Sequence, residues 1–156
     1  MECRLRENGR FVARRLEKEP PFEGDYDVAV IGLGTAGAVA FRTAVTEGLK
    51  VIGIEKYNGM GGLSTLGIVC FGGGLNQRLD DYERLASKGK VEYESVISEL
   101  YLEGEKIVGF GYFRNGIAHR VRTKQMIDAT GNATVVRMAG LQVRKGRVID
   151  NAMGAC

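Results

Sequence analysis

The segment 26–55 restricts the fold of this chain more than any other feature of its sequence. A short β-branched run at 26–31 leads directly into a glycine motif at 32–37. Small and apolar residues of helical character follow, and a second apolar run occupies 50–55. Short apolar runs of this kind are typical of buried parallel strands. The segment therefore predicts a strand, a helix that ends before Glu47-Gly48 and a second strand, joined as a right-handed βαβ unit.

The glycine motif has the form GxGxxG and lies between the first predicted strand and the predicted helix. Gly32 permits the tight turn, Gly34 lets the backbone approach a pyrophosphate, and Gly37 allows the helix to pack closely on the strand. Thr35 and Ala36 begin the helix, whose unpaired N–H groups and partial positive charge favour phosphate. The motif therefore predicts the phosphate-binding turn of a dinucleotide-binding protein.

Glu55 closes the second predicted strand, about twenty residues after the glycines. A carboxylate at this place accepts hydrogen bonds from a ribose hydroxyl pair. Its charge repels a 2′-phosphate, so NADP is disfavoured as the ligand. The glycines and Glu55 do not by themselves distinguish FAD from NAD.

Further along the chain, strand-like runs are separated by glycine turns. The runs at 95–103, 106–114 and 117–123 are joined by Gly104 and by Asn115-Gly116, and they predict a three-stranded antiparallel meander at about 91–123. The other segments predict a loop, with or without a short helix, at 58–74, a helix or a connection at 80–90, a strand with a glycine turn at 125–131 and a short helix at 133–139.

The N-terminal segment alternates polar and apolar residues around Asn8-Gly9, a dipeptide that favours a tight hairpin turn. We therefore expect an N-terminal β-arm at 1–24 and a cofactor-binding domain at 25–156. The predicted fold class is α/β, a Rossmann-like unit with a mainly parallel sheet and an inserted antiparallel meander.

The composition is that of a soluble globular protein, with 44% hydrophobic and 26% charged residues and a net charge of +3 from both signs along the chain. Such a charge pattern does not imply nucleic-acid binding. No apolar run has the length of a membrane span, and the charged N-terminal segment has no signal-peptide pattern. We therefore expect a cytoplasmic protein that binds neither nucleic acid nor a membrane.

The side chains that most often carry catalysis or metals are sparse in this sequence. Cys3, Cys70 and Cys156 lack the spacing of metal ligands or of a disulfide framework, so we expect no metal site and read Cys70 as a small buried residue. His119 is the only histidine, and its place on a predicted strand favours an exposed residue over a catalytic base. No catalytic residue is identified from the sequence.

Three stretches carry a resemblance to a known family. They are Tyr-Asp-Val-Ala-Val-Ile-Gly-Leu-Gly-Thr-Ala-Gly at 26–37, Gly-Gly-Leu-Ser-Thr-Leu-Gly at 61–67 and Ile-Asp-Ala-Thr-Gly-Asn at 127–132, with Ala139-Gly140 beyond them. Together they resemble the N-terminal FAD-binding part of the FAD-dependent oxidoreductase family, within the glutathione-reductase-like two-dinucleotide-binding flavoproteins. The resemblance implies FAD as the cofactor.

The resemblance also implies roles for residues after Glu55. Gly61 and Gly62 would give the backbone access to the cofactor, while Ser64 or Thr65 would hydrogen-bond to phosphate or ribityl oxygens. Ordinary loop capping is the alternative for these two hydroxyl groups.

A second group of implied contacts lies near the end of the chain. Ala129, Thr130 and Gly131 would pack against the flavin dinucleotide, and Lys56, beside Glu55, completes the candidate cofactor-binding residues. This chain has Asn132 where many members of the family have aspartate, and asparagine keeps the hydrogen bonding but lacks the charge.

The function expected from these features is that of the FAD-binding part of a flavin-dependent oxidoreductase. The flavin would accept a hydride or electrons from an unidentified small-molecule substrate. Members of the family continue beyond the position of Met153, so we expect an oligomer, or a second polypeptide or continuation of the chain, to complete the active site. A noncatalytic subunit that binds FAD or another adenine nucleotide and an NAD-dependent dehydrogenase are the alternatives.

Overall fold

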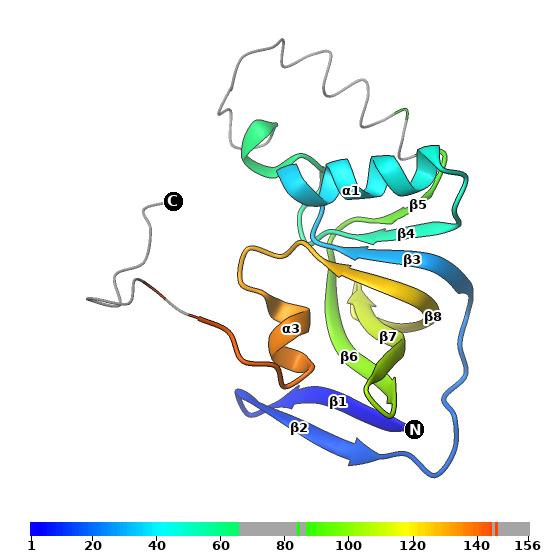
Figure 1. Cartoon of the computed structure of the whole chain (residues 1–156), viewed down its shortest axis with the longest axis vertical. Coiled ribbons are helices and arrows are strands. Elements are labelled where there is room, and N and C mark those ends of the chain that lie inside the picture. Colours follow the sequence, from blue (N-terminus) through cyan, green and yellow to red (C-terminus); the bar gives the residue numbers. More distant parts are fainter. Residues whose placement is uncertain (66–83, 85–86, 145, 147–156) are drawn as a thin grey trace.

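The structure is a computed structural model that describes residues 1–65, 84, 87–144 and 146. Within these residues a single mixed sheet of eight strands carries α1 along one side and α3 near the N-terminal hairpin (Figure 1). Cys70, Cys156, the glycines at 72–74 and most of the predicted loop and connection at 66–86 lie outside the described residues.

The elements follow one another along the chain with short connections in most places. They are β1 (Glu2–Glu7), β2 (Arg10–Arg15), β3 (Asp25–Ile31), α1 (Thr35–Thr46), β4 (Val51–Ile54), the 3-10 turn η1 (Gly62–Ser64), β5 (Lys90–Glu92), β6 (Ser95–Glu103), β7 (Lys106–Arg114), β8 (Ile117–Asp128) and α3 (Thr134–Met138). Across the sheet their order is β2-β1-β6-β7-β8-β3-β4-β5.

The segment 26–55 folds as strand, helix and strand. β3 and β4 are parallel neighbours, and α1 connects them along one face of the sheet (Figure 1). Phe41 and Val45 of α1 pack with Val30 and Val51 of the two strands in a buried cluster. Burial of each such side chain stabilises the fold by about 1.5 to 3 kcal/mol, and this packing fixes the helix against the strands that precede and follow it.

The expectation of a mainly parallel sheet is wrong for the sheet as a whole. Among the described strands, the three parallel pairs are β3 with β4, β3 with β8 and β4 with β5. The four antiparallel pairs are β1 with β2, β1 with β6, β6 with β7 and β7 with β8. The parallel pairs therefore form only one end of a larger mixed sheet.

The sheet is mixed because of β8, which runs unbroken over the segment where the sequence predicts two strands. Its first half is antiparallel to β7, its second half is parallel to β3, and Arg122 is paired with both neighbours. The meander is thus continuous with the nucleotide-binding strands, and its antiparallel pairs belong to the same sheet. β5, a strand of three residues at the opposite edge, was not predicted.

Both predicted Asn-Gly hairpin turns are confirmed. Asn8 and Gly9 have φ of 47° and 80°, and Asn115 and Gly116 have φ of 50° and 77°. Two successive positive φ values are what a type I′ turn requires, and Asn-Gly is the dipeptide that tolerates them best. The first hairpin is hydrogen-bonded to β6 through β1, so the N-terminal segment extends the sheet.

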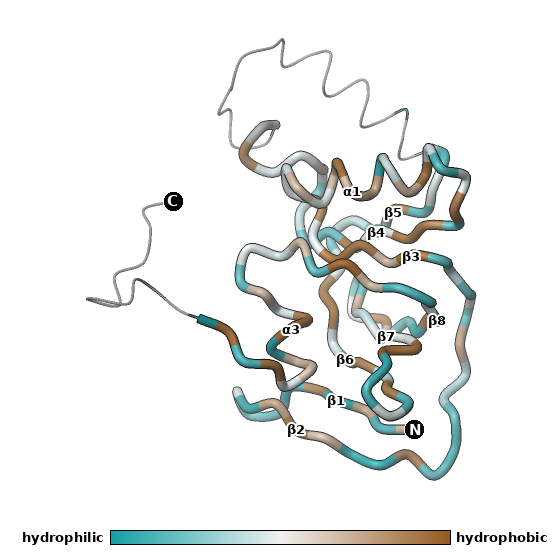
Figure 2. The backbone as a smooth tube through the Cα atoms, in the orientation of Figure 1, coloured by the Kyte–Doolittle hydropathy of each residue, from teal (hydrophilic) through white to brown (hydrophobic). Residues whose placement is uncertain are grey.

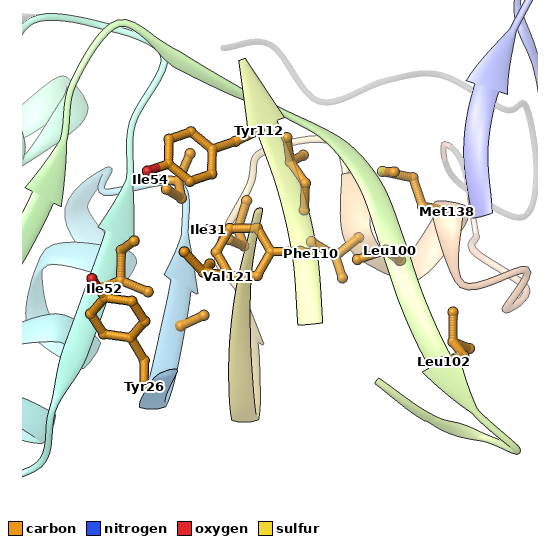
Figure 3. Packing of buried hydrophobic residues seen from close by; sticks show 13 residues of the cluster. Tyr26, Ile31, Ile52, Ile54, Leu100, Leu102, Phe110, Tyr112, Val121 and Met138 are labelled. Carbon is orange, nitrogen blue, oxygen red and sulfur yellow. The ribbon is translucent and has the colours of Figure 1, made fainter. Parts of the chain in front are cut away.

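The sheet curls so that its β5 edge approaches β7 of the meander. The Tyr112 hydroxyl of β7 donates a hydrogen bond of 3.3 Å to Oε1 of Glu92 in β5, although β8, β3 and β4 lie between these strands in the sheet. The curl encloses a second buried cluster, in which Ile52 and Ile54 face Phe110, Leu100 and other residues of the meander (Figure 3). The meander therefore covers the face of β3 and β4 that α1 leaves free.

The hydropathy of the backbone follows this layering. Figure 2 shows hydrophobic residues along β3 and β4, whereas the segment that links β2 to β3 is mostly hydrophilic. None of the described helices has the length and apolar character that a membrane crossing needs.

Candidate functional site

A cavity of about 260 Å³ opens where β3, β4 and β8 end. The three strands are parallel at this point, so their carboxyl ends meet at one edge of the sheet. Ligands of open α/β sheets bind at this edge. The walls of the cavity come from the glycine turn after β3, the residues after β4, the start of β6 and the loop between β8 and α3.

Most of the residues that the sequence nominates for cofactor binding meet at this cavity. Those that line it are Gly32, Gly34, Glu55, Lys56, Gly62, Ala129, Thr130 and Gly131. Thr35, Ala36, Gly37, Gly61 and Thr65 belong to the same turns but do not line it. For Ser64, only the backbone within η1 is described.

The three glycines of the GxGxxG motif meet different surroundings. A Cβ at Gly37 would lie 1.8 Å from the carbonyl oxygen of Gly32, so no larger residue fits between the helix and the turn. Gly32 itself has φ of 84°, and its missing Cβ would lie 3.0 Å from the carbonyl oxygen of Ala129. A Cβ at Gly34 would meet no atom within 4 Å. Gly32 and Gly37 are thus required by packing, whereas Gly34 leaves open space beside the helix N-terminus.

The second glycine loop contacts the first. The Thr35 hydroxyl donates to the carbonyl oxygen of Gly61 at 3.0 Å, and the N–H of Gly61 donates to the carbonyl oxygen of Leu33 at 2.7 Å. A Cβ at Gly62 would lie 3.0 Å from the Cα of Gly34. The glycines allow the two loops to lie directly against each other and to form one wall of the cavity.

The hydroxyl of Thr65 is used within its own loop. Thr65 is buried, and its Oγ1 donates to the carbonyl oxygen of Met60 at 2.6 Å. A second contact, of 3.4 Å, joins it to the carbonyl oxygen of Gly62. These contacts are those of loop capping, the alternative that the sequence leaves open for this residue.

Glu55 is almost fully buried, with 6% of its surface exposed, and both of its carboxylate oxygens accept hydrogen bonds from the backbone. Oε2 accepts the N–H of Leu33 at 2.7 Å, and Oε1 accepts the N–H of Tyr57 at 3.0 Å. Each carboxylate oxygen has a second lone pair, so Glu55 can still accept hydrogen bonds from a ligand in the cavity. The carboxylate therefore holds the glycine turn and faces the cavity at the same time.

Ser95, Val96 and Ile97, at the start of β6, line the cavity and were not predicted to do so. Ser95 comes to the site because its N–H donates to the carbonyl oxygen of Glu55 at 2.9 Å. A contact between segments forty positions apart depends on how the sheet curls, and a local pattern carries no signal for it. Asn132 and Thr134 also line the cavity, beside the predicted glycine turn at Gly131.

The lone histidine lies away from the cavity. His119 sits on β8, stacks on Tyr112 with ring centroids 5.1 Å apart, and places Nδ1 2.8 Å from a carboxylate oxygen of Glu23. The hydrogen bond from His119 lowers the pKa of Glu23, so this carboxylate stays ionised at neutral pH. The contacts give the histidine a structural role on the meander.

No protein-family model matches the chain, and no curated protein matches it. Several solved structures are similar to the chain. A geranylgeranyl bacteriochlorophyll reductase-like protein from Thermoplasma acidophilum is 21% identical with a TM-score of 0.59, over 76% of this chain and 43% of its own. A triple mutant of the flavin-dependent brominase Bmp2 is 25% identical with a TM-score of 0.56, over 74% and 41%.

A third similar structure is the myxobacterial chondrochloren halogenase CndH, a variant of FAD-dependent halogenases. It is 16% identical with a TM-score of 0.50, over 72% of this chain and 38% of its own. The chain thus spans about two fifths of the length of these three proteins. The similarities show the fold of the chain over about three quarters of its residues.

Proposed function

We propose that this chain is the FAD-binding part of a flavin-dependent oxidoreductase. The observation that carries the proposal is the open space beside Gly34, at the N-terminus of α1, in a cavity that also contains the carboxylate of Glu55. Backbone N–H groups at a helix N-terminus suit a pyrophosphate, and a carboxylate on the next strand suits a ribose. The residues present therefore fit the adenosine diphosphate half of the cofactor.

Each wall of the cavity has a proposed task. Gly34 lines the cavity, and its backbone N–H group and those of Thr35 and Ala36 behind it, at the N-terminus of α1, hold the pyrophosphate. Glu55 accepts hydrogen bonds from the ribose. Gly62 and Gly131 let the backbone approach the ligand closely, because neither carries a side chain. Ile31, Ile54 and Ile97 give the cavity an apolar floor. When bound, FAD supplies the redox chemistry, and the chain binds and orients it.

FAD is favoured over NAD by the second glycine loop and by the similar structures. The loop at Gly61 and Gly62 lies against the phosphate-binding turn. The resemblance to the glutathione-reductase-like flavoproteins implies that this loop runs beside the cofactor. The brominase is named as flavin-dependent and the halogenase as FAD-dependent. The visible absorbance spectrum of the purified protein separates the two ligands, because bound flavin colours the protein yellow and NAD does not.

Substitution of Gly34 by valine tests the proposed site. Because a Cβ at this position meets no atom within 4 Å and φ is −62°, the Gly34→Val protein is expected to fold with an unchanged melting temperature. Its side chain would occupy the space proposed for the pyrophosphate, so flavin content should fall to the background level. Flavin retention equal to that of the wild type, in a folded Gly34→Val protein, would overturn the assignment.

A further inference from the structure

We propose that Asp128 is a positioning residue for the cofactor cavity, holding the loop between β8 and α3 against the GxGxxG turn. The proposal rests on the function proposed above and adds a residue to it. Asp128 is the last residue of β8 and does not line the cavity. Its effect on a ligand is therefore transmitted through the residues that follow it.

The carboxylate of Asp128 binds both ends of this loop. Oδ1 accepts the N–H of Thr130 at 3.0 Å and the hydroxyl of Thr130 at 2.6 Å, and Oδ2 accepts the N–H of Val136 at 3.0 Å. The hydroxyl oxygen of Thr130 in turn accepts the N–H of Thr134 at 2.7 Å. One carboxylate thus fixes the turn at 129–131 and the first turn of α3.

The N-cap residue of α3 does not provide a capping side chain for this helix. Ala133 stands at the N-cap of α3, where its side chain makes no capping hydrogen bond, and its φ of 50° is one that residues other than glycine rarely adopt. The N–H of Val136, at the third helical position, is one that an N-cap side chain normally satisfies, and here Asp128 accepts it from upstream. Thr130 accepts the N–H of Thr134, at the first helical position. The conformation of the loop therefore depends on these two residues more than on its own sequence.

Ala129 connects the loop to the phosphate-binding turn. Its N–H donates to the carbonyl oxygen of Ile31 at 2.9 Å. Its carbonyl oxygen is 3.0 Å from where a Cβ of Gly32 would lie, and its own Cβ is 3.1 Å from where a Cβ of Gly37 would lie. Such close packing means that a displaced loop displaces the glycine turn as well. The carboxylate of Asp128 therefore acts on the cavity through Ala129.

The test compares Asp128→Asn with a matched control. Asparagine has one acceptor oxygen, so it cannot serve both Thr130 and Val136, and its amide N–H₂ would face a donor. Asp27→Asn is the control, because Asp27 also accepts a backbone N–H, that of Lys50 at 2.9 Å, but lies on β3 away from the cavity. Asp128→Asn should weaken FAD binding about tenfold or more, and Asp27→Asn should leave it unchanged.

The environment of the bound flavin distinguishes a reshaped cavity from a general loss of stability. Folded wild type and folded Asp128→Asn are each saturated with FAD. If the cavity is reshaped, the visible circular dichroism spectrum of the flavin should differ between the two proteins. Wild-type affinity and an unchanged spectrum in Asp128→Asn would overturn the proposal.

A measurement without ligand separates the positioning role of Asp128 from the proposal that the chain binds FAD. In the apoprotein, Asp128→Asn should speed amide hydrogen exchange at Thr130, Thr134 and Val136 about tenfold and shift the amide resonances of Gly32 and Gly37. Unchanged glycine resonances would overturn the positioning role whatever FAD does. A wild-type protein that binds no FAD would overturn the proposed function. The amide resonances of Gly32 and Gly37 in the apoprotein would still test whether Asp128 positions the loop.

Discussion

Glu55 has two kinds of hydrogen-bond partner, and this governs how it responds to substitution. Its oxygens accept the N–H groups of Leu33 and Tyr57, and Glu55 also lines the cavity, where it can accept hydrogen bonds from a ligand. In Glu55→Gln one oxygen is replaced by an N–H₂ group that faces a backbone donor. We predict that FAD affinity falls by about 1 to 3 kcal/mol, the range for hydrogen bonds to a charged group. Calorimetry on refilled apoprotein measures this change, and an equal affinity would remove Glu55 from the site.

Cys3 shows how burial sets the chemistry of a single residue. Burial, assisted by the negative charge of Glu99, raises the pKa of its thiol from 9.0 to about 11. The thiolate is the reactive form, so in the folded protein Cys3 should resist thiol reagents at pH 8. A Cys70→Ser, Cys156→Ser background isolates this residue, and rapid labelling of the folded protein would contradict the prediction.

The same shift has a consequence for stability. The unfolded thiol loses its proton near pH 9, whereas the folded thiol keeps it to about pH 11. Between these values the folded state binds more protons, so the free energy of unfolding should fall as the pH rises. Urea titrations at pH 8.5 and 10.5 measure this, and Cys3→Ala should show a smaller loss.

Among single residues, those whose roles depend on neighbouring segments of the chain were the ones best predicted from the sequence. The glycine motif and Glu55 are recognisable because their roles depend on a turn, a helix N-terminus and a strand end that are close in the chain. Ser95 and Asp128 were not predicted. The first reaches the cavity through the curl of the sheet, and the second acts through a hydrogen-bond network that spans eight positions and has no fixed pattern.

Among the secondary-structure elements, β5 and β7 are joined by the side chain of Glu92. This carboxylate is 6% exposed and lies 2.5 Å from Nη1 of Arg114 and 3.0 Å from Nζ of Lys90. Burial, and then the charge of Glu92, raises the pKa of Tyr112, whose hydroxyl remains a donor at neutral pH. The cluster closes the curled sheet at the edge opposite the N-terminal hairpin.

Glu92→Gln is predicted to lower the free energy of unfolding by about 1 to 3 kcal/mol, because the negative charge is lost and one acceptor oxygen becomes an N–H₂ group that faces a cationic donor. Urea denaturation measures the change. Glu103→Gln, at an exposed position on β6, serves as the matched control and should lie within about 0.5 kcal/mol of wild type. Equal effects of the two substitutions would show that the cluster does not close the sheet.

The elements themselves were predicted more accurately than their arrangement. Strands at 95–103 and 106–114 and the helix from Thr35 were found from periodicity and turn residues. The sequence divided β8 into two strands, because Thr123 to Gln125 interrupt its apolar pattern. That division concealed the mixed sheet, since β8 is the strand that is paired on one side with the meander and on the other with β3.

For the whole molecule, we predict that the active unit contains more polypeptide than this chain. Cavities for drug-sized ligands occupy about 300 to 1,000 Å³ and enclose most of the ligand, whereas the described residues form a cavity of about 260 Å³. Tyr57 and Val96, which line it, are more than half exposed. A partner subunit or a continuation of the chain would enclose the flavin ring and the substrate.

Size-exclusion chromatography with native mass spectrometry tests this prediction. The expected result is that the isolated chain either forms an oligomer or binds FAD without turning over a substrate. A monomer of this chain that retains FAD and completes turnover would contradict it.

The pairing of β3 with β8 has a consequence for biosynthesis. Asp25 and its partner Arg122 are 97 positions apart, so at about 5 to 20 residues per second the ribosome delivers β8 roughly 5 to 20 seconds after β3. During this interval one side of β3 has unpaired backbone groups and apolar side chains, a combination that promotes pairing with other chains. The nascent protein is therefore most prone to aggregation before β8 emerges, and slower synthesis at this stage would lengthen the period of risk.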